Sequence, residues 1–158
     1  MVEQPATALG TSPDAVQFRF RDDEMVDHAT VTVDSCCDQT TATAFRIEPG
    51  DDARVLLPFL DRLALVEVNF PSFADGRGYS AARILREAGY TGELRAVGDV
   101  LIDQLSHMRR CGFDAFAPDN PLDEDDAKRA FATWENVYQH AFDTHGGKRR
   151  TIVDLRHE

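Results

Sequence analysis

A short segment rich in glycine and arginine, Asp75–Ser80 (DGRGYS), is the part of the sequence best suited to binding chemistry. Gly76 and Gly78 permit positive φ or a close backbone approach, and a helix that starts here would direct free N–H groups at an anion. Arg77 would add a planar fork of hydrogen-bond donors. The segment therefore predicts a site for a small oxyanion.

The residues that follow extend this pattern along one side of a helix. Tyr79, Arg83 and Arg86 are spaced i, i+4 and i+7, so they share a helix face. A structural alternative stays open, in which the glycines only form a tight turn. In that case the arginines would only pair with acids such as Glu87 or Asp99.

Carboxylates and one cysteine near this segment are candidates for catalysis. Asp75, Asp99 and Asp103 could transfer a proton or hold Mg²⁺, although Asp99 is better explained as a helix N-cap. Cys111 could be a nucleophile, or a small buried hydrophobic residue. The catalytic candidates are therefore Asp75, Asp99 and Cys111.

Motifs for redox cofactors and metals are missing from the sequence. It contains no GxGxxG or GxxxxGK[ST] loop, no CxxCH haem site and no cysteine set for an iron–sulfur cluster. The histidines are isolated from one another, without an HExxH pattern. Cys36 and Cys37 are adjacent and poorly placed to bridge each other, so we interpret them as plain thiols. We expect a protein without cofactor or metal.

The elements that must position these residues follow a repeating pattern. From Ala42 onward, short apolar runs alternate with helical periodicity, which is typical of βα units and a mainly parallel sheet. An open flavodoxin-like sheet and a half-barrel fit this pattern equally. We expect strands at Ala44–Ile47, Leu63–Asn69, Glu93–Val97 and Phe113–Ala117, and helices from Asp52 to about Pro58, over Tyr79–Ala88, over Asp99–Arg110 and over Asp123–Ala141.

Two details of these helices are predicted as well. Pro58 should end or kink the first helix, and Gly112 should stop the third. In the fourth helix, an apolar stripe that includes Phe131, Trp134 and Tyr138 should pack in the core.

The N-terminal part is predicted to decorate this α/β unit. Val16–Arg21 and His28–Val33 each alternate in polarity, and the acidic residues between them suggest the turn of a β-hairpin. We expect one domain over residues 16–143, with the hairpin region at 16–41 and the βα units at 42–143. Residues 1–15 and 144–158 are predicted to be tails.

The overall charge limits the partners. The formal net charge of −11 disfavours nucleic acid and anionic membrane surfaces. The sequence contains neither an apolar run long enough to cross a bilayer nor a signal pattern, and its three cysteines are an odd number. These features predict a cytoplasmic protein. Arginine nevertheless outnumbers acids between Asp75 and Gly112, so a local anion site is compatible with this charge.

The segment Phe70–Phe116 resembles a known family. Its blocks DGRGYS, GELRAVGDV, DQL and RCGFDAF occur in the order typical of the bacterial family called domain of unknown function 934, over about a third of the chain. The resemblance implies a link to sulfite reduction, because members are commonly labelled as oxidoreductases of that pathway and lie beside sulfite reductase genes. The signature places ligand-binding candidates at Asp75, Gly76, Arg77, Gly78, Tyr79, Ser80, Arg83, Arg86, Arg95, Asp99, Asp103, Gln104 and Arg110.

Two functions from different classes follow from the resemblance and the residues together. An accessory protein would dock to sulfite reductase or another sulfur-assimilation enzyme, or hold a small oxyanion. A small enzyme would act on a sulfur metabolite, with Arg77 and Arg83 clamping the anion and Asp75 or Asp99 as acid or base. We favour the accessory protein, because sulfite reduction needs electrons and the sequence offers no cofactor site to carry them.

Overall fold

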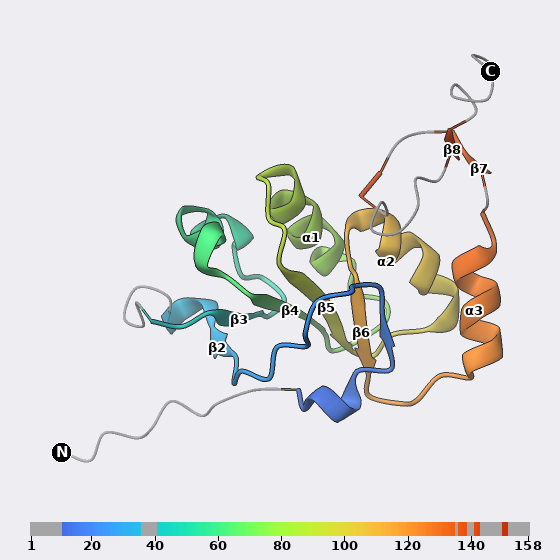
Figure 1. Cartoon of the computed structure of the whole chain (residues 1–158), viewed down its shortest axis with the longest axis horizontal. Coiled ribbons are helices and arrows are strands. Elements are labelled where there is room, and N and C mark those ends of the chain that lie inside the picture. The colour runs from blue at the N-terminus through green and yellow to red at the C-terminus, as the bar shows by residue number, and fades with distance from the viewer. Residues whose placement is uncertain (1–10, 36–40, 135, 139–140, 143–149, 152–158) are drawn as a thin grey trace.

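A six-stranded sheet is the centre of the fold in the computed structural model, which describes residues 11–35, 41–134, 136–138, 141–142 and 150–151 (Figure 1). Strands β2 to β6 run parallel, and β1 is antiparallel to β6. The predicted α/β class with a mainly parallel sheet is confirmed. The strands are β1 (Phe18–Arg19), β2 (Val31–Thr32), β3 (Ala44–Ile47), β4 (Leu65–Phe70), β5 (Glu93–Gly98) and β6 (Ala115–Pro118).

The strand order decides between the two predicted arrangements. The sheet reads β1-β6-β5-β4-β3-β2, so the parallel strands are neighbours in the order in which they occur along the chain. A flavodoxin-like sheet reverses its order at a switch point, where its ligand binds. The order therefore agrees with the half-barrel-like arrangement and not with the flavodoxin-like one.

Each of the four predicted βα units is present. Asp52 and Asp123 cap the first and last helices through their carboxylates, and Gly112 ends α2 with a φ of 112°. The helical elements that follow the parallel strands are the 3₁₀ helix η3 (Ala53–Arg62), α1 (Arg77–Glu87), the 3₁₀ turn η4 (Ile102–Gln104) with α2 (Leu105–Cys111), and α3 (Glu124–Ala132).

The predicted ends of two helices need correction. η3 continues through Pro58 to Arg62, and it is a 3₁₀ helix rather than an α-helix. α3 ends at Ala132, well before Ala141: the Thr133 hydroxyl donates to the Arg129 carbonyl and replaces the next backbone bond of the helix. Trp134 and Tyr138, predicted to be core residues, are 60% and 71% exposed.

The N-terminal strands form but do not pair as a hairpin. β1 lies against β6 and β2 lies against β3, at opposite edges of the sheet. The chain between them crosses the sheet in Figure 1. The alternating pattern predicted the two strands, whereas their partners depend on contacts distant in sequence.

The chain ends contribute small elements. A 3₁₀ turn, η1 (Pro13–Ala15), precedes β1, and another, η2 (Val33–Ser35), follows β2. β7 (Asn136–Val137) pairs in parallel with β8 (Arg150–Thr151). Cys36, Cys37 and most of the two predicted tails lie outside the described residues.

The two faces of the sheet differ in chemistry. One face packs against the helices through buried apolar side chains, among them Phe45, Val66 and Phe116. On the other face, one register row across the strands reads Thr32, Arg46, Glu67, Arg95, Ala115 and Arg19. This row of residues contains buried ion pairs.

Candidate functional site

The start of α1 is already occupied by a carboxylate of the chain itself. Asp75 Oδ1 accepts the backbone N–H of Arg77 at 3.1 Å and its Nε at 2.9 Å, while Oδ2 accepts Nη2 at 2.6 Å. The Arg77 side chain lowers the pKa of Asp75 to about 2, so this group is a carboxylate at neutral pH. Asp75 therefore uses the donors that the sequence assigned to an external oxyanion.

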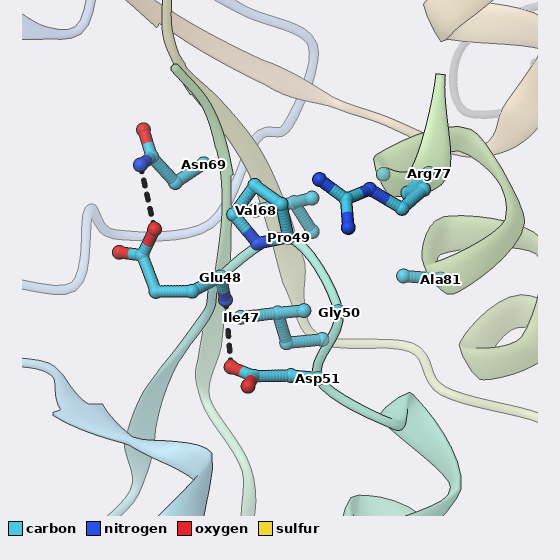
Figure 2. Close-up of a pocket in the computed structure, with 10 residues that line it drawn as sticks. Ile47, Glu48, Pro49, Gly50, Asp51, Val68, Asn69, Arg77 and Ala81 are labelled. Carbon is cyan, nitrogen blue, oxygen red and sulfur yellow. Dashed lines mark hydrogen bonds between the residues drawn. The ribbon is translucent and has the colours of Figure 1, made fainter. Parts of the chain in front are cut away.

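A small pocket lies beside this turn, between the ends of β3 and β4 and the start of α1 (Figure 2). The Arg77 guanidinium points across it toward Pro49. Glu48 and Asp51 also line the pocket, and Asn69 donates to the Glu48 carboxylate at 2.7 Å. With a cavity volume of about 20 Å³ the pocket has room for about one water molecule. Its size and its carboxylates make it a poor receptor for a divalent oxyanion.

The two glycines of the turn have different roles. Neither Gly76 nor Gly78 has positive φ. A Cβ at Gly78 would lie 2.6 Å from the Phe70 ring and 2.9 Å from Val68 Cγ1, so this glycine lets α1 approach the sheet closely. A Cβ at Gly76 would meet its nearest atom at 4.0 Å. The close backbone approach that the sequence predicted at this turn is therefore the approach of α1 to β4.

Two other predicted site residues hold the loop that precedes this turn. Asp99 Oδ2 accepts the Phe73 N–H at 2.9 Å, and Gln104 Nε2 donates to the Phe73 carbonyl at 2.8 Å. Asp99 therefore fixes the β4–α1 loop and is not the helix N-cap that the sequence favoured. The N–H and the carbonyl of Phe73 are thus both hydrogen-bonded to side chains. The residue itself is 52% exposed to solvent.

Tyr79 links the start of α1 to α2 instead of facing a ligand. Its ring packs at 5.5 Å from Phe70 and at 5.0 Å from His107. Burial raises the pKa of Tyr79 to about 12, so the phenol stays protonated. His107 Nε2 lies 3.8 Å from the sulfur of Cys111. Burial also raises the pKa of the Cys111 thiol, which favours the reading of a buried thiol over that of a nucleophile.

Arg83 and Arg110 lie together at a second pocket, although they are far apart in sequence. Arg83 comes from α1 and Arg110 from α2, and Ala141 and Phe142 complete the lining among the described residues. Arg83 pairs with Glu87 at 2.8 Å, as the structural alternative predicted. This pocket has a volume of about 230 Å³, much larger than the pocket at Arg77.

Arg86 is a structural residue. It donates to the carbonyls of Gly112, Tyr90 and Gly92 and forms a 2.8 Å ion pair with Asp114. Its side chain is buried, and burial lowers its pKa below the usual value for arginine. Arg86 therefore ties the end of α1 to the start of β6.

Arg95 is also enclosed by protein, on the opposite face of the sheet. Its guanidinium pairs with Glu67 at 3.1 Å and with Glu93 at 2.7 Å, and the residue is fully buried. Ser80 and Asp103 are exposed. The signature residues thus serve several places: the turn before α1, the Phe73 loop, the Arg83–Arg110 pocket and buried ion pairs.

Sequence reasoning missed Phe73, Phe142 and the Glu48–Asn69 pair. Phe73 lies within the segment FPSFADG, where an apolar residue in a polar loop was a usable signal. Phe142 gave no such signal, because the sequence predicts a buried helical stripe that ends near it. Glu48 follows the predicted strand Ala44–Ile47, and Asn69 is the last residue of the predicted strand Leu63–Asn69. The carboxyl ends of such strands are where loops carry function.

Residues 44–147 match the family described as a bacterial protein of unknown function (DUF934), which is about two thirds of the chain. The chain belongs to the DUF934 family. No curated protein and no solved structure matches it.

The DUF934 match includes the described residues that line the Arg83–Arg110 pocket and the residues that hold the backbone of Phe73. It does not include residues 11–43, which contain β1 and β2. No described helix of this DUF934 chain is long and apolar enough to span a membrane. Within the described ranges, no group of three or more His, Cys, Asp or Glu residues could hold a metal ion.

Proposed function

We propose that this DUF934 protein is an accessory protein of sulfite reduction that docks to an enzyme of that pathway through its Phe73 loop. The pathway rests on the resemblance of Phe70–Phe116 to proteins labelled with sulfite reduction. The docking role rests on the way in which the structure holds Phe73.

The single observation that carries the docking role is an exposed aromatic residue, Phe73, whose backbone is held by hydrogen bonds. Asp99 and Gln104 bind the two backbone groups of Phe73, and Gln104 is itself held because its Oε1 accepts the Leu101 N–H at 3.2 Å. The Ser72 hydroxyl accepts the Ala74 N–H at 3.3 Å on the other side of Phe73. Three side-chain bonds thus fix the loop and a fourth holds Gln104, while the Phe73 side chain stays half exposed.

This arrangement favours association with a protein. Burying a phenylalanine side chain stabilises by about 1.5–3 kcal/mol, and at Phe73 roughly half of that gain is left unrealised in the isolated chain. Because the loop is ordered before binding, a partner would not have to supply the free energy of ordering it. Ordered aromatic anchors that enter a partner's pocket are typical binding hot spots.

The enzymatic alternative receives less support from the geometry. Arg77 and Arg83 line separate pockets, so they do not form one clamp. Asp75 is a carboxylate of low pKa bound to Arg77, and Asp99 uses an oxygen to hold Phe73. Neither is arranged as an acid or base beside an open cavity.

Affinity capture in a bacterium that lacks its own copy of the gene tests the proposal. The tagged chain should retain a sulfite reductase subunit in stoichiometric amount, and Phe73→Ser should reduce that retention at least about tenfold. Val55→Ser is the matched control, because Val55 is also an exposed apolar residue, at 41%, but lies on η3. It should retain the partner as the wild type does.

Growth gives a second readout of the same proposal. A deletion strain should grow on sulfide but not on sulfate or sulfite, and Phe73→Ser should fail to restore growth while the purified variant melts like the wild type. Full complementation by Phe73→Ser with unchanged capture would refute docking through this loop. Turnover of a sulfur metabolite by the isolated chain would favour the enzyme instead.

A further inference from the structure

We infer that the pocket between α1 and α2 is a binding site for a small oxyanion, held by the guanidinium groups of Arg83 and Arg110. The site is separate from the Phe73 loop, and the inference does not depend on the proposed docking function.

The fold brings the two arginines to one pocket. Arg83 lies in the middle of α1 and Arg110 lies in the last turn of α2, and these helices pack against each other. A segment distant in sequence closes the pocket: the Phe142 N–H donates to the Arg110 carbonyl at 3.1 Å. The Phe142 ring is 6.0 Å from the Arg83 guanidinium carbon. The described lining therefore consists of two cationic side chains, one aromatic ring and Ala141.

Two guanidinium charges act at this pocket in an otherwise acidic protein. Glu87 takes one nitrogen of Arg83 through an ion pair. A guanidinium has five N–H donors in a fork, so Arg83 keeps further donors for a ligand. Both arginines also act on the nearby Cys111 thiol, where their charges oppose the effect of burial on its pKa. Their positive fields thus converge at this end of α2.

Size and donor geometry indicate the class of ligand. The pocket has a volume of about 230 Å³, so it can admit a small ion together with water. Planar guanidinium forks match the paired oxygens of sulfate, phosphate and sulfite, with which they form charge-assisted bonds. The pocket at Arg77 offers about a tenth of that volume and is lined by the carboxylates of Glu48 and Asp51.

The two buried arginines of these helices, Arg86 and Arg109, set a contrast. Arg86 makes four bonds to protein groups, and Arg109 donates to the Phe113 carbonyl at 2.9 Å with its guanidinium 4.1 Å from the Phe20 ring. Both are buried in protein contacts. Arg83, in comparison, has a side chain that is 59% exposed at the mouth of a pocket.

Titration calorimetry of the full chain with sodium sulfate, phosphate and sulfite tests the site. We expect one ion to bind per chain, and Arg83→Gln and Arg110→Gln each to weaken binding at least about tenfold, because each removes a charged hydrogen-bond donor. Arg110→Lys keeps the charge without the fork and should bind more weakly than the wild type, which covers the case in which Arg110→Gln does not fold. The matched controls are Arg77→Gln, at the smaller pocket, and Arg54→Gln, on exposed η3.

Each outcome decides the inference. Binding that is lost in Arg83→Gln and kept in both controls supports it. The inference is overturned if none of the three ions binds at about 10 mM, or if Arg83→Gln binds as tightly as the wild type. Loss of binding in Arg77→Gln alone would move the ion to the turn before α1. Partner capture by the Arg83→Gln protein should be unchanged, so failure here is distinguishable from failure of docking at Phe73.

Discussion

The two faces of the sheet are sealed by different interactions. On the helix side, buried apolar residues of β3 to β6 pack against η3, α1, α2 and α3. On the other side, Arg95 lies between Glu67 and Glu93, and Arg19 and Arg46 extend the ion pairs in both directions. A parallel sheet is normally covered by helices on both faces. Here one face is covered by a segment of chain instead.

The N-terminal segment supplies that cover. Arg19 of β1 pairs with Glu93 at 3.0 Å, the Thr30 hydroxyl donates to Glu67, and the Thr11 carbonyl accepts from Arg95. These three contacts come from residues before Ala44, outside the family match. The face of the sheet that packs against the helices is therefore built within the matched segment. Burial of the opposite face, called the ionic face here because Glu67, Glu93 and Arg95 form ion pairs on it, depends on residues that precede the match.

The largest expected effect comes from breaking the ionic face at its centre. Arg95→Ala should destabilise the chain by about 3–5 kcal/mol, because Glu67 and Glu93 would remain buried with fewer partners. Urea denaturation at pH 7 measures this change. The charge-balanced pair Arg95→Met with Glu67→Met should recover most of the loss, since apolar residues can replace a buried ion pair. A single variant that costs less than about 1 kcal/mol would mean that water reaches this face.

The next effect tests how closely the helix face is packed. Gly78→Ala should cost about 1–2 kcal/mol, because a Cβ would overlap the Phe70 ring and Val68 and this strain outweighs the helix propensity of alanine. Gly76→Ala is the matched control two residues away, where a Cβ would meet its nearest atom at 4.0 Å, and it should change stability by less than about 0.5 kcal/mol. Equal melting temperatures for the two variants would contradict close packing at Gly78.

The contrast between the faces also explains what the sequence could predict. The periodicity of Leu65–Phe70 and of Arg77–Glu87 depends on local spacing, so the βα units were predictable. Glu67 and Arg95 alternate with apolar neighbours, but their sequence does not tell which segment will cover them. Pairing of β1 with β6 joins residues about a hundred positions apart, beyond the reach of a local pattern.

In the candidate site, too, local motifs could be predicted from the sequence, whereas contacts between distant residues could not. The turn and its glycines were visible as a motif, but sequence could not show that Asp75 would take the donors of Arg77. The four arginines Arg83, Arg86, Arg109 and Arg110 of α1 and α2 cannot be told apart from the sequence. Only packing separates Arg86, which is buried among carbonyls, from Arg83, which lies at a pocket.

The smallest expected effect concerns the acid sensitivity of the covering segment. Asp23 accepts from Arg21 and Arg19 at 2.6 Å each, and hydrogen bonding to Arg21, followed by that to Arg19, lowers its pKa from 3.8 to about 2. Because the folded pKa is depressed, the stabilisation is present above the unfolded value near 3.8 and is lost as the pH falls through about 2. Its side chain is 53% exposed, so solvent screening limits the contribution to less than about 1 kcal/mol. Asp23→Asn should therefore lower the urea midpoint slightly at pH 7 and should converge with the wild type near pH 2. A difference that stays constant from pH 7 to pH 2 would show that the charge of Asp23 does not hold this segment on the ionic face.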